Sequence, residues 1–513
     1  MGYKGVMQEY ESRKSEWLIL GGIITLAVFL RFFRLAHQSL WVDEILSYKA
    51  FTSAAGTPFW KKLLYDVHGP LYSLIMHFWS AVSKSDFWLR TPSAIAGVCA
   101  VYALFRWFVV IGRRDLALPA ALFMALSPFH LYYSQELRFY ALLSLFVIVT
   151  LIVFERFRAT PTLRSGVALG ISFALACLAH FSALFLGMAF FVYLAFSGRM
   201  RGKHLRYGAL AAVIVIIVIA PWIYREISFL RQIRVVGISA LPVAERLRGE
   251  LTLSRWSYAY ALYAFSAGYS FGPGLRELHL VTSASALMAK YAGALITTGA
   301  IFGGLFVSGI IRSARDGRLG FFLSGILVAA VSLTAITAFN VKVFNVRYLM
   351  CAYPMYVALV VYGLPSGRQM RFLAGAAACA VMLVSDWNYH FNPDYAREDV
   401  RDAAAAVMQN ETKGDLIIAP AVEGVFAHYY AGPNTITYIG PSVLGAARVD
   451  EAIAVCFAAH SRIWYLRSRS WDKDPEGTLR RVLPKRGAMA GSWRFPGVDL
   501  ELYGRRTNAA PSH

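Results

Sequence analysis

The chain has 513 residues, of which 57% are hydrophobic and only 16% are charged, against about a quarter charged in soluble globular proteins. This composition excludes an ordinary soluble domain, and several apolar stretches reach the roughly 20 residues that cross a hydrocarbon core about 30 Å thick. The net charge of +21 does not indicate nucleic-acid binding, because much of the excess lies in short loops between apolar segments. Such basic loops orient helices in a membrane and contact anionic lipids.

The first apolar segment, residues 17–33, follows a polar N-terminus. It lacks a small-residue cleavage site, so we interpret it as a retained helix rather than a signal peptide. Arg13 and Lys14 precede it and place the N-terminus in the cytoplasm. Arg31 and Arg34, at its far end, run against this orientation, although such side chains near a helix end can snorkel to the interface.

The remaining basic clusters divide the chain into spans when all of them are assigned to the cytoplasm. These clusters lie at 113–114, 156–164, 199–206, 312–318 and 368–371. The predicted spans are residues 17–35, 90–111, 116–131, 138–154, 166–182, 184–197, 208–223, 287–311, 319–338, 349–364 and 372–387. About eleven transmembrane helices result, and an odd number puts the C-terminus outside.

The external segments are then 36–89, 128–138, 224–286, 339–348 and 388–513, with a tight turn near His180. Residues 70–79 are apolar but short. If they crossed the membrane, the 113–114 cluster would lie outside. We therefore expect an external juxtamembrane helix in the interface.

From residue 389 the chain changes character. Short strands are predicted at 415–419, 435–439, 463–466 and 498–503, and helices at 399–408 and 450–460. This alternation predicts a small external α/β domain over 389–513, after a transmembrane domain over 1–388. The chain has no internal repeat, which disfavours a transporter built from two related halves.

The first external segment carries three groups that could do chemistry. Asp43 and Glu44 are adjacent carboxylates. They are either solvated acids of the loop with no function in chemistry, or they serve as a general base or as metal ligands. His68 opens the motif His-Gly-Pro-Leu-Tyr, which ends at Tyr72 and starts a helix. This histidine is either a turn residue at the interface or a ligand for a phosphate or sugar hydroxyl.

Further polar residues occur where later spans begin or end. Glu136, Arg138 and Tyr140 belong to Ser-Gln-Glu-Leu-Arg-Phe-Tyr, which is either a structural ion pair or a group facing a cavity. His180 is a lone histidine at the end of the fifth span, and lone histidines are more often structural. Arg276 lies in Gly-Pro-Gly-Leu-Arg-Glu-Leu within the long external loop.

Lys342, Arg347 and Tyr348 precede a late external helix start. Basic residues at this position oppose the positive-inside trend, which favours a functional role. A topology built from the basic loops alone places all of these motifs on one side of the membrane. A group of carboxylates, cations and aromatic residues of this kind is typical of an enzyme.

Together the motifs resemble the GT-C superfamily of integral-membrane glycosyltransferases, and most closely its bacterial protein-mannosyltransferase-like branch. That branch includes lipid A aminoarabinose and lipopolysaccharide-core galacturonic acid transferases. Trp-x-Asp-Glu, His-x-Pro-Leu-Tyr, Ser-Gln-Glu-x-Arg-x-Tyr and Arg-Tyr occur in the family's order, within a resemblance that covers about residues 17–400. Gly69 departs from the pattern, because many relatives have a second proline there.

The resemblance implies a polyprenyl-phosphate sugar donor presented from the membrane. It also implies a glycolipid, polysaccharide or protein acceptor at the periplasmic face of a bacterial inner membrane. Asp43 matches the family's catalytic base, and Arg347, with Lys342 and Arg138, suits the donor phosphate. The expected substrate-positioning residues are Glu44, His68, Tyr72, Glu136, Tyr140, His180, Arg276 and Tyr348.

The expected chemistry needs only one carboxylate. A phosphate, whose second pKa is about 6, leaves without protonation, so a base for the acceptor hydroxyl and cations for the departing charge suffice. Single displacement inverts the anomeric centre. No cofactor is required, although Asp43, Glu44 and Glu136 could gather around a divalent cation. The five scattered cysteines show no paired spacing and predict neither a disulfide framework nor a metal site.

Three other functions stay open from the sequence. The first is a transporter for polyprenyl-linked lipids or solutes, and the second is a polymerase or ligase that takes a pyrophosphate-linked oligosaccharide. The third is a non-catalytic glycolipid-binding membrane protein. The C-terminal domain is also rich in arginine, which makes either a solvated basic surface or a contact for anionic headgroups. These arginines are Arg462, Arg467, Arg469, Arg480, Arg481, Arg494, Arg505 and Arg506.

Overall fold

The computed structural model describes residues 3–52, 58–64, 69–236, 253–280, 283–339 and 344–506. Their contacts divide the chain into two compact units, each described by itself below. The helical unit comprises Met1–Leu35, Lys49–Pro273 and Ser285–Asn388. The mixed unit comprises Ala36–Tyr48, Gly274–Ala284 and Tyr389–His513, so it includes a short segment that follows the first span.

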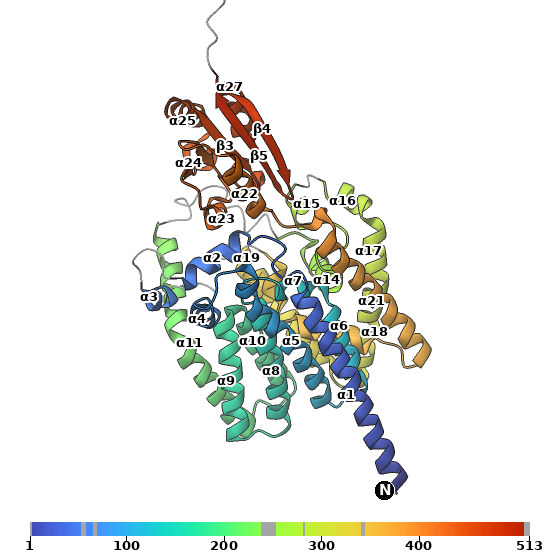
Figure 1. Ribbon diagram of the computed structural model, residues 1–513. Helices are drawn as coiled ribbons and strands as arrows, with labels where there is room; N and C mark the ends of the chain where they lie inside the picture. Colours follow the sequence, from blue (N-terminus) through green and yellow to red (C-terminus); the bar gives the residue numbers. More distant parts are fainter. Residues whose placement is uncertain are drawn as a thin grey trace, which may run out of the picture. The chain divides into compact units, whose positions relative to one another are not determined.

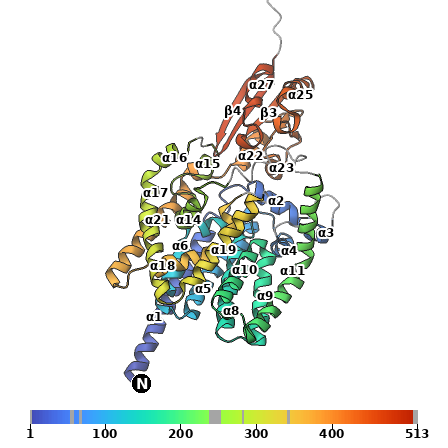
Figure 2. The same cartoon turned by 180° about the vertical axis from the view of Figure 1, so that it is seen from behind.

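The helical unit is a bundle in which neighbouring helices run side by side, as α8, α9 and α11 do in Figures 1 and 2. Its helices are α1 (Tyr3–Phe32), α3 (Phe59–Leu64), α4 (Pro70–Trp79), α5 (Asp86–Val110), α6 (Arg114–Leu126), α7 (Pro128–Ser134), α8 (Tyr140–Ala159), α9 (Leu163–Ala179), η1 (Phe181–Ala183), α10 (Leu184–Phe196), α11 (Gly202–Val236), α14 (Ser257–Ala267), α16 (Ala284–Lys290), α17 (Ala292–Thr298), η3 (Gly299–Gly303), α18 (Gly304–Arg315), α19 (Leu319–Ala338), η4 (Val346–Leu349), α20 (Tyr353–Tyr362) and α21 (Arg368–Phe391).

Seven helices in the described part of the chain are long and apolar enough to cross a membrane. An eighth span results if α6 and α7, which meet at 58°, are counted as one broken helix. Three shorter apolar helices, Leu163–Ala179, Phe181–Phe196 and Tyr353–Tyr362, occupy the remaining predicted spans. The prediction of an α-helical polytopic membrane protein is therefore confirmed.

The break between α6 and α7 has a local cause. Pro128 lacks a backbone N–H and disfavours helical geometry at the residue before it, and Ser127 is accordingly extended. The Ser127 hydroxyl then accepts a hydrogen bond from the His130 backbone N–H at 3.1 Å and caps the new helix. The bend brings the chain to the turn that carries Glu136 and Arg138.

The basic loops meet at one end of the helical unit. Arg113 bridges to Asp316 at 2.6 Å, which joins the loop before α6 to the loop before α19. Glu155, near the end of α8, accepts from Arg158 at 2.6 Å and from Arg318 at 2.9 Å. Loops that the positive-inside rule assigns to one side of the membrane therefore lie together in the fold.

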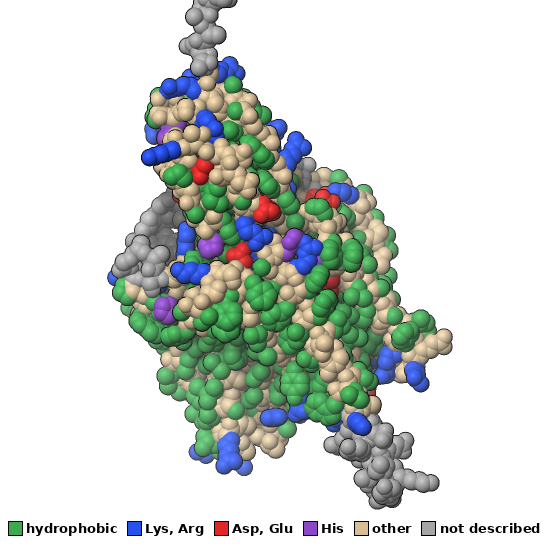
Figure 3. Space-filling view, viewed as in Figure 1, with side chains coloured by type: hydrophobic (Ala, Val, Ile, Leu, Met, Phe, Trp, Pro, Cys, Tyr) green, Lys and Arg blue, Asp and Glu red, His purple; other side chains and the backbone are tan. Residues whose placement is uncertain are grey.

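Hydrophobic side chains cover most of the helical unit on the face shown in Figure 3. Over the whole unit, the exposed hydrophobic residues include Phe191 on α10, Ile216 and Ile217 on α11, and Val331 on α19. An exposed apolar surface of this extent is unusual in a soluble protein and is typical of helices that face lipid. Lysine and arginine side chains gather at the end of the bundle where α8 connects to α9.

The mixed unit contains one five-stranded sheet in the order β2-β1-β3-β5-β4. β2, β1 and β3 are parallel, whereas β5 is antiparallel to both β3 and β4. Its elements are α2 (Val42–Phe51, whose last turn belongs to the helical unit), α15 (Leu275–Leu280), η5 (Pro393–Tyr395), α22 (Val400–Asn410), β1 (Leu416–Ile418), α23 (Glu423–Tyr429), β2 (Thr435–Thr437), α24 (Pro441–Leu444), α25 (Ala446–Ala459), β3 (Arg462–Arg467), α26 (Ser470–Lys473), α27 (Thr478–Arg486), β4 (Gly487–Phe495) and β5 (Val498–Arg505).

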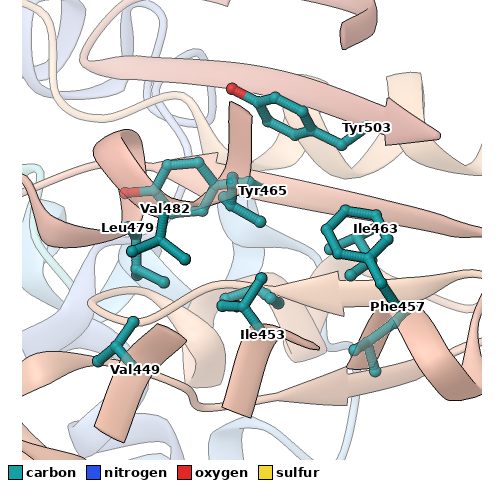
Figure 4. Close-up of a cluster of buried hydrophobic side chains, with 11 residues drawn as sticks. Val449, Ile453, Phe457, Ile463, Tyr465, Leu479, Val482 and Tyr503 are labelled. Atoms are coloured by element: carbon teal, nitrogen blue, oxygen red, sulfur yellow. The ribbon is translucent and has the colours of Figure 1, made fainter. Parts of the chain in front are cut away.

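A compact hydrophobic core holds this sheet to its helices. Ile453 and Phe457 from α25 pack with Ile463 from β3 and with Leu479 and Val482 from α27 (Figure 4). The predicted α/β character is confirmed, and every predicted strand and helix of this region is present. The sequence reading missed β4, because its alternation of exposed and half-buried residues leaves little apolar signal.

Candidate functional site

Glu136 and Arg138 lie in the non-helical turn that joins α7 to α8, and both residues are almost fully buried. The turn is fastened on two sides. Gln135 donates through its side-chain amide to the backbone oxygens of Leu30 at 3.0 Å and Phe33 at 2.9 Å, at the end of α1. These carbonyls have no partner within their own helix, so Gln135 acts as a C-terminal cap that anchors the turn.

A second anchor comes from α5. The hydroxyl of Ser93 donates to the Arg138 backbone oxygen at 2.9 Å, and it also lies 3.0 Å from the Tyr72 hydroxyl on α4. Ser93 and Tyr72 are both buried. Tyr72, predicted as a substrate-positioning residue, thus supports the backbone at Arg138.

Gly69 shows why the chain departs from the expected second proline. Its φ is +110°, in the region that only glycine adopts easily, and proline is restricted to about −65°. An added Cβ would also overlap the Leu178 backbone oxygen at the end of α9. The tight approach of this turn to α9 therefore requires glycine.

His180 lies between α9 and α10 within an aromatic stack. The centroid of its ring lies 4.7 Å from that of Phe139 and 5.8 Å from that of Tyr348. The interplanar angles of these two pairs are 16° and 10°, so the rings are stacked. The Nδ1 atom accepts from the Ser182 backbone N–H at 3.1 Å. Because Nδ1 is an acceptor, the neutral ring carries its proton on Nε2.

Two cations converge on the ring of Tyr140. The guanidinium carbons of Arg138 and Arg347 each lie 5.8 Å from its centroid, and Arg138 also lies 4.8 Å from the Phe139 ring. Arg347 stands on η4, which Asn345 caps by accepting from the Arg347 backbone N–H at 3.2 Å. The structure thus brings together two arginines that are distant in sequence, against the aromatic residues between them.

Tyrosine hydroxyls extend the same cluster. Tyr133 and Tyr269 share a hydrogen bond of 2.9 Å, and Glu136 and Arg347 both act electrostatically on Tyr133. Burial raises the pKa of Tyr269, while Arg347 opposes that rise. The phenol of Tyr269 therefore stays protonated at neutral pH, as a neutral hydrogen-bonding group.

Seven of the predicted residues thus form what we call the arginine–aromatic cluster: Tyr72, Glu136, Arg138, Tyr140, His180, Arg347 and Tyr348. The cluster lies at the start of α8, and the basic loops lie at its end, about 30 Å away for a 20-residue helix. Predicted site residues and basic loops are therefore at opposite ends of this helix.

Asp43 and Glu44 belong to the mixed unit, in the first turn of α2. Asp43 is partly exposed, whereas Glu44 is 0% exposed and bridges to Arg397 at 3.3 Å. The backbone N–H of Trp41 also donates to the Glu44 carboxylate at 3.2 Å. The two adjacent acids thus differ, since the side chain of Asp43 is partly exposed and that of Glu44 is held inside the fold.

The remaining predicted residues stand elsewhere. Arg276 is exposed on α15 in the mixed unit, outside the arginine–aromatic cluster. His68 and Lys342 lie outside the described residues. Among the residues that the structure does describe, no group of three or more histidine, cysteine, aspartate or glutamate side chains could hold a metal ion.

The sequence reading missed several buried polar residues. Asp386 on α21 and His130 on α7 are buried within apolar helices, and an ionisable residue inside a predicted span was the signal that could have found them. Arg397 gave no such signal, because it stands in a charged stretch that follows the last predicted span. Only the tertiary structure pairs it with Glu44.

The arginine–aromatic cluster suits a group-transfer reaction in which the donor loses an anionic leaving group. Arg138 and Arg347 supply fixed positive charge, and the tyrosine hydroxyls supply neutral donors in a largely buried setting. Preorganised cations act most strongly where water is excluded.

Comparison with protein families matches residues 67–224 to the family described as dolichyl-phosphate-mannose-protein mannosyltransferase. A comparison with curated protein sequences finds no significant match.

Solved structures match over nearly the whole chain at low sequence identity. ArnT from Cupriavidus metallidurans in the apo state matches with a TM-score of 0.57 and 11% identity, over 96% of this chain and 98% of that one. The same protein bound to undecaprenyl phosphate matches with a TM-score of 0.55 and 12% identity, over 95% and 98%. The apo oligosaccharyltransferase of Archaeoglobus fulgidus matches with a TM-score of 0.52 and 12% identity, over 96% and 75%.

Proposed function

We propose that this chain is an inverting glycosyltransferase. It is a multi-pass membrane protein with the fold of the GT-C glycosyltransferases, as its motifs indicated. It transfers a single sugar from a polyprenyl-phosphate donor to a hydroxyl of a cell-envelope glycolipid, polysaccharide or protein. The reaction takes place at the periplasmic face of a bacterial inner membrane. The observation that carries this proposal is the convergence of Arg138 and Arg347 on the Tyr140 ring.

In the proposed reaction, the acceptor oxygen attacks the anomeric carbon and the bond from that carbon to the phosphate oxygen breaks. Asp43 takes the acceptor proton, and polyprenyl phosphate leaves with the bonding electrons. Arg138 and Arg347 stabilise the negative charge that develops on this phosphate. No acid is needed for the leaving group, because phosphate is a far weaker base than an alkoxide.

The donor assignment draws support from the relative whose structure contains undecaprenyl phosphate. Planar guanidinium groups bind phosphate oxygens in pairs, which favours arginine over lysine in this role. Glu136, His180 and Tyr348 belong to the arginine–aromatic cluster and are proposed to position the sugar. Glu44 is fully buried, so its proposed role is to hold the first turn of α2, which carries Asp43.

The experiment uses full-length protein in proteoliposomes with a panel of radiolabelled polyprenyl-phosphate sugars and a crude envelope glycolipid fraction. We expect label to enter the acceptor fraction with wild type and to stop with Asp43→Asn. Asp450→Asn, which changes an exposed acid of the mixed unit, is the matched control and should keep full activity.

Two results would contradict the proposal. Transfer that persists at the wild-type rate in Asp43→Asn would refute the assignment of the base. Saturable donor binding, or donor movement across the bilayer, with no transfer from any sugar would replace the transferase by a binding protein or a transporter.

A further inference from the structure

The loop before α2 has no regular secondary structure from Ala36 to Trp41, so its backbone groups need partners from elsewhere. The segment that enters α22 contacts this loop first through the side chain of Ser39. The Ser39 hydroxyl donates to the Glu398 backbone oxygen at 2.6 Å and accepts from the Val400 N–H at 3.3 Å.

Further contacts from the same segment and from α23 tie down the rest of the loop. Arg401 donates to the backbone oxygens of Ala36 at 2.9 Å and His37 at 2.6 Å. The Tyr429 hydroxyl accepts from the Leu40 N–H at 2.7 Å. The loop is thus bonded through its main chain, which fixes the direction in which the chain enters α2.

The last contact reaches the helix itself. Arg397 donates to the Glu44 carboxylate at 3.3 Å, and the side chains of the two residues are 7% and 0% exposed. Removing one partner of a buried ion pair costs more than removing one partner of an exposed pair, because the other charge is left buried and unpaired. Glu44 is the neighbour of Asp43, so this bond sets the rotation of the first turn of α2.

We propose that Arg397, Arg401 and Tyr429 form a latch through which the C-terminal part of the chain positions Asp43 for proton abstraction. These are positioning residues, since they act on Asp43 through the backbone of residues 36–41 and through Glu44. This inference rests on the proposed function, because it takes Asp43 as the base. The latch would give the C-terminal domain a role in the reaction. The sheet and the hydrophobic core of that domain do not by themselves indicate such a role.

A positioning role predicts a split in the kinetic constants. The cations proposed for the donor phosphate belong to the helical unit, so loosening the latch should leave donor KM within about twofold of wild type. Turnover should fall at least about tenfold, because a displacement of about 1 Å can cost a hundredfold in rate. A residue that only stabilises the fold would not separate kcat from KM.

The test compares full-length Arg397→Ala, Arg397→Lys and Arg401→Ala with wild type by hydrogen–deuterium exchange and by initial rates. Arg486→Ala is the matched control, because it breaks an exposed arginine–aspartate pair of the same unit, with Asp450. We expect faster exchange confined to residues 36–48 in the two alanine variants, lower kcat, and partial recovery of both in Arg397→Lys. The control should match wild type in both measurements.

Unchanged exchange in residues 36–48 would overturn the latch, and faster exchange with wild-type kcat would overturn its positioning role. Faster exchange across the helical unit in both Arg397→Ala and Arg397→Lys would show that Arg397 contributes only to the overall stability of the protein, and it would also overturn the proposal. Failure of the proposed function can be told apart from failure of the latch. In the first case the wild-type protein would transfer no sugar, while hydrogen–deuterium exchange would still report on the latch.

Discussion

Arg31 provides a quantitative test of how the helical unit is held together. Its position near the end of the first span suggested a side chain that snorkels to the interface, and this interpretation is wrong because the residue is 0% exposed. The guanidinium donates to the backbone oxygens of Ala27 at 3.3 Å, Met124 at 2.9 Å and Ala125 at 3.0 Å. It also lies 2.9 Å from Nδ1 of His130.

These contacts predict a large penalty for Arg31→Met. The Met124 and Ala125 carbonyls stand in the last turn of α6, where a helix has no donors of its own. Methionine keeps much of the volume of arginine but leaves these two carbonyls and His130 without the donor. A buried polar group left unsatisfied costs about 1–3 kcal/mol. We therefore expect a loss of about 3–5 kcal/mol, in the range for removing one partner of a buried charged network.

The free energy of unfolding can be measured for full-length protein in mixed micelles. Arg368→Met, at an exposed position at the start of α21, is the control and should change it by no more than about 0.5 kcal/mol. Arg31→Lys should fall between wild type and Arg31→Met, because it keeps the charge but not the planar set of donors. A loss in Arg31→Met no larger than that of the control would refute the claim that Arg31 ties α1 to the end of α6.

Three further outcomes are expected. Gly309→Ala should destabilise the same unfolding equilibrium by at least about 1–3 kcal/mol, because its Cβ would overlap a backbone oxygen of α20. Gly375→Ala should leave the free energy of unfolding unchanged, because an added Cβ at this position on α21 would meet no other atom. Equal losses of stability in the two variants would contradict this packing argument. Arg347→Ala should lower the initial transfer rate by about 10²-fold and Arg347→Lys by less, whereas equal rates in wild type and Arg347→Ala would exclude a phosphate contact. Arg480→Ala with Arg481→Ala should weaken binding to anionic vesicles at low salt. The difference from wild type should vanish near 1 M, where charges more than about 3 Å apart are screened; a salt-independent difference would point to a non-electrostatic cause.

The basic surface of the mixed unit is smaller than its arginine count suggests. Arg462 pairs with Asp415 at 3.0 Å, and Arg467 pairs with Asp499 at 2.5 Å. Such pairs neutralise much of the charge that could attract headgroups. The headgroup-contact hypothesis therefore depends on the arginines whose side chains stay exposed, which are Arg480, Arg481, Arg494, Arg505 and Arg506.

The sequence by itself determined the helical architecture. A helix in lipid must satisfy its backbone hydrogen bonds internally, so an apolar stretch of sufficient length specifies both the element and its extent. Residues 319–338 were predicted as a span and form α19 over Leu319–Ala338. The positive charge of the connections likewise identified loops that meet at one end, as the Arg113–Asp316 bridge shows. Both signals are local in sequence.

Tertiary structure alone decided which polar residues work together. Gln135 and Glu136 are neighbours in one motif, yet one caps α1 while the other joins the arginine–aromatic cluster. Asp43 and Glu44 diverge in the same way, because Asp43 is partly exposed whereas Glu44 is buried against Arg397, 353 positions later in the chain. Burial and pairing depend on partners that the fold brings from a distance, and no local pattern encodes them.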